Sequence, residues 1–399
     1  MSQESTTLES NLEVDVFEES QICGDSEIYS LPRFLYLFIS SWIAFLGVCG
    51  NIVLLYLFTS RKYPNTPPTL YPSVLTVLDA LICAMYILLF GADAVIGYLH
   101  LESLFITYHI YIVPAFVVSR ITQLAIPYML IFATLERFVW IAGDMRNSVL
   151  KTMYSQRGRM ITMIVTLTIC VLLRLPTFWA VTVYEYPECE DFFRTKTASA
   201  SVWVTESLVY HVYDFHLLSI AQTVVPFIVL LTFNIVIVKR LYSMKVEGTN
   251  GPEYSASTPL KNESSVYGLP EHKPSMTSVD IPSNALLSKR RMNPQVKSAI
   301  YTMVAIVASY LLSNTLHLIL TGLERSNSDL LKHPTDPNLA SAFHTTFSDA
   351  VSFVYMFTSG IRIAIYYVCN PAIRTDLNAL LKNLFNKSNA VKNTLDTHI

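Results

Sequence analysis

Charge is scarce in this chain. Only 15% of the 399 residues are Asp, Glu, Lys or Arg, compared with about 25% in an average soluble domain, and 52% are hydrophobic. Residues 34–60, 217–238 and 298–323 contain no charged side chain at all. Each stretch is long enough to cross the hydrocarbon core of a bilayer as a helix that rises about 1.5 Å per residue. The composition therefore excludes an ordinary soluble domain.

Signatures of catalysis are also missing. The chain contains no glycine-rich phosphate-binding loop, no His-x-x-x-His pair and no closely spaced cysteine pair. It shows no internal repeat of 20–50 residues and no hydropathy symmetry between its halves, which disfavours the repeats and discontinuous helices of transporters. We therefore expect no enzyme activity, no metal site, no cofactor and no nucleic-acid partner.

Isolated charges interrupt four further apolar stretches. These cover approximately residues 70–98, 104–141, 157–182 and 342–368. Seven spans result, and an odd number of spans places the two termini on opposite sides of the membrane. We predict an all-α membrane protein whose residues 34–368 form a bundle of seven transmembrane helices. For residues 120–140 alone, the alternative is a soluble core helix with two ion pairs.

The distribution of Lys and Arg predicts the orientation, because these residues stay on the cytoplasmic side of short loops. With the N-terminus outside, the cytoplasmic segments hold 19 of the 28 Lys and Arg residues and the outer segments hold five. Residues 1–32 contain neither Lys nor Arg, so we expect no cleavable signal peptide, and the first span would act as its own signal anchor. The predicted location is the plasma membrane.

Two polar segments lie outside the predicted spans. Residues 1–33 form an acidic outer tail that we expect to be disordered. Residues 244–292 are rich in Ser, Thr, Pro and Gly and predict a disordered third cytoplasmic loop. Its hydroxyl groups are candidate sites for kinases and arrestin, and a plain linker is the alternative.

A helix is expected directly after the seventh span. Asn370 suits an N-cap, Pro371 suits the first helical position, and apolar residues then recur on one face. We predict that residues 369–386 form a short amphipathic helix on the inner leaflet of the bilayer. Residues 387–399 would complete the cytoplasmic tail.

Five landmarks resemble those of the rhodopsin-like (class A) G-protein-coupled receptors in order and spacing. They are Gly50-Asn51, Leu75-Asp79, Glu136-Arg137-Phe138, Pro226 and the segment from Tyr366 to Asn370. The resemblance covers about residues 34–386. It implies a receptor that converts the binding of an extracellular ligand into activation of a heterotrimeric G protein.

Three further segments are similar to invertebrate neuropeptide receptors of the FMRFamide and myoinhibitory (sex-peptide) kind. They are RLPTFW at 174–179, PFIVLLTFNIVI at 226–237 and YLLSN at 310–314. The predicted ligand is a cationic, amidated neuropeptide. The predicted outer segments hold 18 acidic residues against five basic ones, which favours a cationic ligand, although acidity can also serve solubility alone.

Other ligand classes fit the sequence less well. Ser119 stands where amine receptors carry Asp, so a monoamine lacks its usual counter-ion. No lysine lies between Lys332 and Lys382, so retinal cannot form a Schiff base in helix seven. A chemosensory receptor for a small external molecule is the second reading. A transporter or channel is the more remote alternative.

The resemblance implies roles for two groups of residues. At the cytoplasmic end Arg137 would engage the G protein when helix six moves, with Tyr366 taking part in coupling. No acidic residue lies between Asp280 and Glu324, so Glu136 alone would hold Arg137 at rest. The predicted ligand contacts are Arg120, Gln123, Glu324 and Asp349.

Two of these ligand contacts have a specific rationale. Arg120 lies 17 residues before Arg137, near the ligand pocket of the family. The ring of Pro127 clashes with the carbonyl of Gln123, which would leave that carbonyl without its helical partner. The alternative for Arg120 is a structural ion pair with Asp93 or Asp349.

In the family, the position of Asp79 binds sodium together with an asparagine of helix seven. Arg362 replaces that asparagine here. We therefore predict an Asp79–Arg362 ion pair that makes the receptor insensitive to sodium. The alternative is that Arg362 faces elsewhere.

The extracellular disulfide of the family cannot form in its usual place. In the family, this disulfide joins the second outer loop to the outer end of helix three. Cys189 lies in that loop, but the segment between Cys83 and Cys170, which includes helix three, contains no cysteine. Cys23 is the other cysteine expected outside. We predict a Cys23–Cys189 bridge, with two free thiols as the alternative.

Helices six and seven lack the prolines that bend them in the family. Asn314 stands in the place of Trp and Leu316 in the place of Pro, while the Asn-Pro of the Asn-Pro-x-x-Tyr element reads Arg362-Ile363. Any kinks in these helices need another cause. The sequence therefore leaves the movement of helix six unexplained.

Overall fold

The computed structural model describes residues 23–24, 29–60, 69–142, 152–249, 294–326, 328–331 and 341–396. The predicted acidic tail before Cys23 and residues 250–292 of the predicted third cytoplasmic loop lie outside the described residues.

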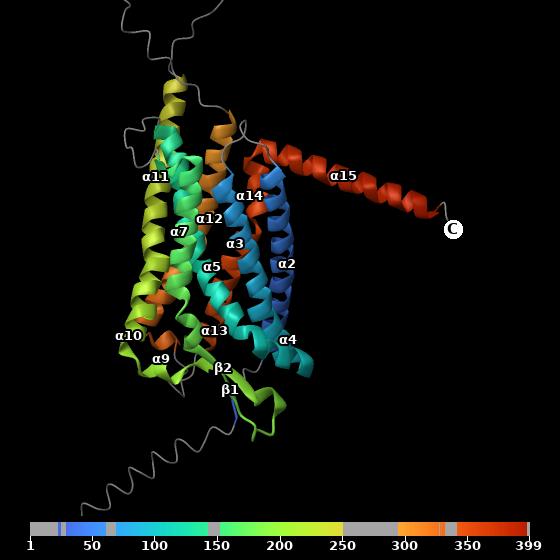
Figure 1. Cartoon of the computed structure of the whole chain (residues 1–399), viewed down its shortest axis with the longest axis vertical. Coiled ribbons are helices and arrows are strands. Elements are labelled where there is room, and N and C mark those ends of the chain that lie inside the picture. Colours follow the sequence, from blue (N-terminus) through green and yellow to red (C-terminus); the bar gives the residue numbers. More distant parts are fainter. Residues whose placement is uncertain are drawn as a thin grey trace, which may run out of the picture.

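Long helices run side by side as a bundle, which confirms the predicted fold class (Figure 1). Six helices of the described residues are long and apolar enough to cross a membrane, and a pair bent by 41° makes the seventh span. The α-helices are joined by π-helical segments (η1, η3, η4) and by 3₁₀ turns (η2, η6). The elements are, in chain order, α2 (Leu31–Ser60), α3 (Leu70–Tyr86), η1 (Ile87–Gly91), α4 (Ala92–Leu99), α5 (Glu102–Ala142), α7 (Gln156–Arg174), α8 (Thr177–Ala180), β1 (Val181–Glu185), η2 (Phe192–Arg194), β2 (Lys196–Ala200), α9 (Val202–Glu206), α10 (Leu208–His211), η3 (Val212–Leu218), η4 (Ile220–Val224), α11 (Val225–Thr249), α12 (Pro294–Arg325), η6 (Asp329–Leu331), α13 (Ala342–Gly360), α14 (Arg362–Cys369) and α15 (Pro371–Asp396).

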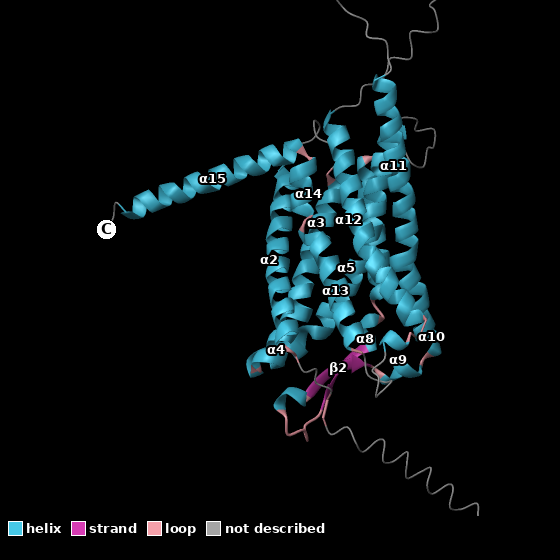
Figure 2. Ribbon diagram, turned by 180° about the vertical axis from the view of Figure 1, so that it is seen from behind, coloured by secondary structure: helices cyan, strands magenta, loops and turns pink. Residues whose placement is uncertain are grey.

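The two ends of the bundle differ. At one end β1, β2 and the short helices α8, α9 and α10 gather, and at the opposite end α15 leaves the bundle sideways (Figure 2). We call these the hairpin end and the α15 end. Cys23 is bonded to Cys189 beside the hairpin, so the chain enters the bundle from the hairpin end and leaves it at the α15 end.

A small β-hairpin adds strands to a chain that was predicted to be all-α. Strands β1 and β2 pair antiparallel, with Val181 opposite Ala200 and Glu185 opposite Lys196. Lys196 donates a hydrogen bond of 2.6 Å to the carboxylate of Glu185, and this bond lowers the pKa of Glu185. The β-branched residues of the VTVYE segment favour a strand, but its shortness hides it beside a transmembrane helix.

Several helices extend beyond their predicted bounds. The first span begins at Leu31 rather than residue 34, and α11 continues to Thr249, into the segment predicted as disordered from residue 244. The helix after the seventh span runs to Asp396 instead of residue 386. No glycine or proline follows Pro371 within α15, so nothing in the sequence terminates that helix at the predicted position.

The bundle packs around α5. Its side chains Leu124, Ala125, Met129 and Leu130 are fully buried among the other helices. In contrast, large apolar side chains such as Trp42 and Leu172 are 59% and 61% exposed on the outside of the bundle. An apolar outer surface around a helical core is what a membrane-spanning bundle requires, because its surroundings are lipid rather than water.

Helices α2 and α13 approach each other at two glycines. A methyl group on Gly47 would lie 2.9 Å from the Sγ atom of Cys83 and 3.0 Å from the Cα atom of Gly360. Small residues permit this kind of close backbone approach between membrane helices.

We therefore predict that Gly47→Ala destabilises the protein by roughly 1–3 kcal/mol, because the added methyl group overpacks the contact between α2 and α13. Thermal unfolding of the purified protein measures the effect. Gly322→Ala is the matched control, since a methyl group there would meet no atom within 4 Å. Equal unfolding temperatures of the two variants would contradict the prediction.

Candidate functional site

Helix α5 carries an arginine toward each end of the bundle. Arg120 lies in its half toward the hairpin end and Arg137 in its half toward the α15 end. Pro127 lies between them inside the helix. The carbonyl of Gln123, four residues before this proline, accepts a hydrogen bond of 3.4 Å from the hydroxyl of Tyr355 in α13. A tyrosine of another span thus fills the place of the missing helical bond.

Glu136 and Arg137 lie buried near the α15 end, with only 1% and 3% of their surface exposed. The nearest approach between their charged groups is 4.0 Å, from Nη1 of Arg137 to Oε2 of Glu136. The other carboxylate oxygen lies 3.1 Å from Nε of Arg159 in α7. The prediction that Glu136 alone holds Arg137 at rest stays a prediction, and the same carboxylate also contacts Arg159. Glu136 lies between two arginines, and the nearer one is Arg159.

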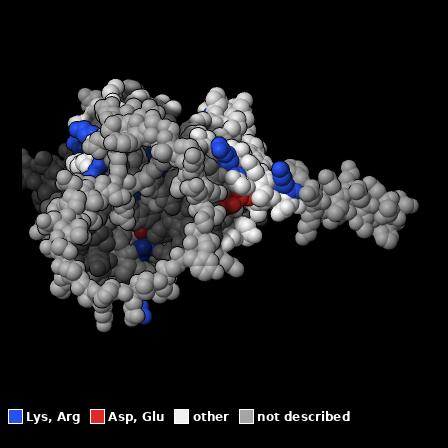
Figure 3. Space-filling view, turned by 90° about the horizontal axis from the view of Figure 1, so that it is seen from above, with Lys and Arg blue, Asp and Glu red and all other residues white. Residues whose placement is uncertain are grey.

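Backbone contacts hold Arg159 in this position. Its Nε and Nη2 atoms donate hydrogen bonds of 3.0 Å and 2.8 Å to the carbonyl of Tyr154. In the sequence Arg159 is one of several basic residues near the start of the fourth span, and no spacing rule links it to Glu136 across two helices. Figure 3, which looks onto the α15 end, shows the bundle hollowed at its centre, with charged atoms of both signs inside the hollow.

Tyr366 is buried in the same half of the bundle. Its ring packs edge-on against Phe58 of α2 at a centroid distance of 5.1 Å, and 4% of its surface is exposed. It lies near enough to Arg137 for the two side chains to interact electrostatically. The three residues expected to take part in coupling therefore share one region of the bundle.

Asp79 and Arg362 meet in the interior of the bundle. The Nη1 atom of Arg362 lies 2.6 Å from Oδ2 of Asp79, and their side chains are 4% and 0% exposed. Arg362 is the first residue of α14, directly after the break at Ile361 where the seventh span bends by 41°. Two residues before the break, the carbonyl of Ser359 accepts a hydrogen bond of 3.1 Å from the side chain of Asn51 in α2. A side chain that enters the hydrogen-bond ladder is a recognised cause of a kink, and none of these residues is a proline.

We predict that Asp79→Asn and Arg362→Gln each destabilise the protein by roughly 3–5 kcal/mol, because each change leaves a buried charge without its partner. The double variant with the two charges exchanged should recover much of the loss. Surface expression and thermal unfolding measure both effects. Replacement of sodium by choline should leave the wild-type unfolding temperature unchanged, since Arg362 already supplies the positive charge. A charge exchange that recovers nothing would count against the pair.

The four predicted ligand contacts do not converge in the structure. Asp349 pairs with Arg33 at 2.8 Å, and Glu324 lies 3.5 Å from Nε2 of His344. No hydrogen bond or ion pair joins either acid to Arg120 or Gln123 within the described residues. Each acid therefore has a described partner of its own, and the role of the four residues in ligand binding stays a prediction.

Arg120 forms no ion pair within the part of the chain that the structure describes. Its guanidinium carbon lies 4.9 Å from the centre of the Phe116 ring, one turn earlier on α5. Neither alternative partner contacts it, since Asp93 accepts a hydrogen bond of 2.5 Å from Tyr29 and Asp349 is paired with Arg33. Arg120 thus presents a half-buried positive charge among the spans.

A chain of polar side chains that the sequence did not suggest crosses the bundle beside Arg120. Arg174, at the end of α7, lies 2.8 Å from Oδ1 of Asp214 and also donates a hydrogen bond to Oε1 of Gln222. Gln222 donates to Gln123 at 3.5 Å, and Gln123 donates to Ser119 at 3.3 Å. From the sequence, Arg174 was only an isolated charge in a span. The cost of burying that charge was the one available signal.

A disulfide and two hydrogen bonds attach the start of the described chain to the hairpin. Cys23 is bonded to Cys189, which is 8% exposed. The backbone N–H of Gly24 donates to the carbonyl of Arg194 at 2.9 Å, and Nε of Arg194 donates to the carbonyl of Gly24 at 2.8 Å. The hairpin and the segment before α2 are therefore fixed to each other.

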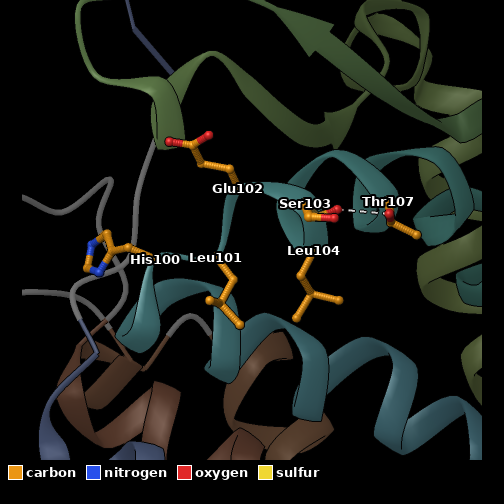
Figure 4. A pocket seen from close by; sticks show the side chains of 6 residues that line it. All are labelled: His100, Leu101, Glu102, Ser103, Leu104 and Thr107. Carbon is orange, nitrogen blue, oxygen red and sulfur yellow. Dashed lines mark hydrogen bonds between the residues drawn. The ribbon is translucent and has the colours of Figure 1, made fainter.

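An open hollow lies beside the hairpin, where α4 ends and α5 begins (Figure 4). His100 ends α4 in a left-handed backbone conformation, with φ of 54°, and its ring meets that of Phe193 edge-on at 5.0 Å. No predicted ligand contact is among the lining residues, which are His100, Leu101, Glu102, Ser103, Leu104 and Thr107.

The family described as 7 transmembrane receptor (rhodopsin family) matches residues 50–361, which is more than three quarters of the chain. No curated protein matches the chain. Within the described residues, no group of three or more His, Cys, Asp or Glu side chains is placed to hold a metal ion.

Proposed function

Because the chain belongs to the rhodopsin family of seven-transmembrane receptors, and such receptors are signalling proteins rather than enzymes, we propose that its ligand is a cationic, amidated peptide. Membership of the family implies a multi-pass membrane protein that couples an extracellular ligand to a heterotrimeric G protein. We further propose that the hairpin end faces outward. The disulfide at that end supports this orientation, since disulfides persist in oxidising compartments outside the cytosol.

The charge at the hairpin end carries the ligand proposal. Each basic side chain described there already has a partner: Arg33 contacts Asp349, Arg194 contacts the Gly24 carbonyl, Lys196 contacts Glu185, and Arg325 contacts the Phe215 carbonyl. Four exposed glutamates at that end form no ion pair within the described residues, namely Glu102, Glu188, Glu190 and Glu206. A surface with uncompensated negative charge attracts cationic ligands and raises their association rate.

The interior of the bundle supports the amidated end of such a peptide. Arg120 has no ion pair among the described residues, and its guanidinium group lies over the face of the Phe116 ring. A guanidinium group offers several N–H donors to a carbonyl oxygen. In the proposed complex, the basic residues of the peptide lie beside the exposed glutamates of the hairpin end. The carbonyl of its terminal amide accepts a hydrogen bond from Arg120. Gln123, on the next turn, is the second proposed contact.

The α15 end supports coupling to the G protein. Arg137 is held in a buried position beside Glu136 and Tyr366, where its donors are not offered to a partner outside the bundle. The proposed active form moves α12 and exposes this arginine. Kinases and arrestin would act on the third cytoplasmic loop, which lies outside the described residues.

Part of α15 supports the proposed contact with the inner leaflet. Ile373 and Leu377 of its apolar stripe pack against the core of the bundle, whereas Leu381 is 43% exposed. The first turns of the helix are therefore anchored to the protein, and the following apolar residues remain available to lipid.

We predict that Arg137→Ala abolishes G-protein activation at matched surface expression, because the donors that engage the G protein are lost. Arg157→Ala removes an exposed arginine from the same end and should signal at close to the wild-type level. Energy transfer between labelled G-protein subunits in intact cells measures both variants. Unchanged signalling by Arg137→Ala would remove Arg137 from this role.

A library of amidated basic peptides, screened with a promiscuous G protein, tests the ligand class. For an agonist found in this way, the double variant Glu188→Gln, Glu190→Gln should raise the half-maximal concentration about two- to fivefold, the factor for an exposed charge pair of roughly 0.5–1 kcal/mol. High salt should remove the difference by screening. Activity confined to small uncharged molecules would instead favour a chemosensory receptor.

A further inference from the structure

The fifth span is irregular in its half toward the hairpin end. Between α10 and α11 the backbone forms two π-helical stretches, η3 and η4. Wide π turns are uncommon, occur often at functional sites, and alter the partners of the local carbonyl groups. In a membrane these carbonyls need partners within the protein.

Each π-helical stretch contains a pair of consecutive residues that bind two different helices. In η3, the side chain of Asp214 contacts Arg174 of α7 at 2.8 Å. The carbonyl of the next residue, Phe215, accepts a hydrogen bond of 2.9 Å from Nη2 of Arg325 in α12.

The second stretch repeats this arrangement. In η4, the side chain of Gln222 accepts a hydrogen bond from the same guanidinium group of Arg174. The carbonyl of Thr223 then accepts a hydrogen bond of 3.3 Å from Nδ2 of Asn314 in α12. The side chain of Asn314 is 2% exposed, so this donor has no access to water as a substitute.

Arg174 and α12 are therefore joined through the same two backbone stretches. The two nitrogen donors of Arg174 bind Asp214 and Gln222, which are eight positions apart in the fifth span. These two hydrogen bonds fix the helical geometry of the backbone between them. If a stretch returned to regular α-helical winding, the carbonyl within it, that of Phe215 in η3 or of Thr223 in η4, would turn away from its donor in α12. Loss of the Arg174 contacts would thus weaken the attachment of α12 to the fifth span, although none of the described hydrogen bonds or ion pairs joins Arg174 to α12.

The α12 helix, in turn, lies over the region of Arg137. Ile300 of α12 packs with Ile237 and Leu241 of α11 and with Phe138, the residue after Arg137. Since Arg137 is 3% exposed, the described arrangement is one in which the arginine is not accessible to a partner outside the bundle. The attachment of α12 to the π-helical stretches maintains that arrangement.

We propose that Arg174 and Asn314 are positioning residues of one restraint, in which Arg174 holds the two π-helical stretches and Asn314 fixes α12 to them. The proposal rests on the proposed function, since α12 is the element that would uncover Arg137. The proposal also names how the ligand acts. The side chain of Asp214 is 41% exposed, so a hydrogen-bond acceptor on the ligand can replace it as the partner of Arg174. This replacement releases α12.

Basal signalling tests the restraint without a known ligand. Asn314→Leu keeps the branched shape of the side chain but removes the donor, and it should raise basal G-protein activation per surface receptor about fivefold, the factor for one hydrogen bond of about 1 kcal/mol. Thr315→Val is the matched control, because the Thr315 hydroxyl donates its hydrogen bond within its own helix, to the Leu311 carbonyl. It should stay at the wild-type level.

Arg174→Gln should raise basal signalling to a similar extent, and Arg174→Lys, which can still reach Asp214, should lie between it and the wild type. The double variant Arg174→Gln, Asn314→Leu should signal no more than the stronger single variant, since both changes release one restraint. If Arg174→Gln does not reach the surface, Arg325→Gln at the exposed end of α12 replaces it. Basal levels equal to wild type, or a double variant that multiplies the single effects, would overturn the proposal.

Each receptor variant is also measured with Arg137→Ala added, which separates the two proposals. If Arg137→Ala abolishes basal signalling but Asn314→Leu does not raise it, only the restraint fails. If the wild type and all variants show the same signal with and without Arg137, the proposed G-protein coupling through that residue fails. A rise in Asn314→Leu that disappears with Arg137→Ala supports both.

Discussion

The buried ion pair between Asp79 and Arg362 is the interaction on which the centre of the bundle depends. In an apolar interior a charge without a partner costs roughly several kcal/mol, so neither residue can be present alone. The pair also requires a bent seventh span, because the break at Ile361 is what begins α14 at Arg362. Asn51 stabilises the bend from α2, and Gly47 lets that helix come close enough to do so.

A second constraint explains where the spans are joined. Every backbone carbonyl inside a membrane needs a donor, so each irregular turn must be matched by a side chain from a neighbouring helix. The carbonyl of Gln123, four residues before Pro127, accepts a hydrogen bond from Tyr355, and the carbonyl of Ala221 in η4 accepts one of 2.9 Å from Tyr128. Asn314 binds the neighbouring Thr223 carbonyl. The departures from regular helix are therefore also the links between helices.

The sequence predicted the parts of this fold that depend on runs of similar residues. Charge-free stretches identify membrane spans because the bilayer sets both their length and their polarity. The contacts of Arg174 could not be found in this way, since Asp214 lies 40 residues away beyond the hairpin. The same holds for Arg159, whose approach to Glu136 depends on how α7 crosses α5. Contacts between distant segments follow from packing, which a single sequence does not reveal.

Helix α15 also determines how much room the molecule occupies. Its 26 residues make a rod of about 39 Å at 1.5 Å per residue. Ile373 packs into the bundle core at its base, so the direction of the rod is set by the protein. It projects from the flank near α2 (Figure 1). Neighbouring copies in a crowded bilayer would therefore be kept apart on that flank and could pack closely only on the others.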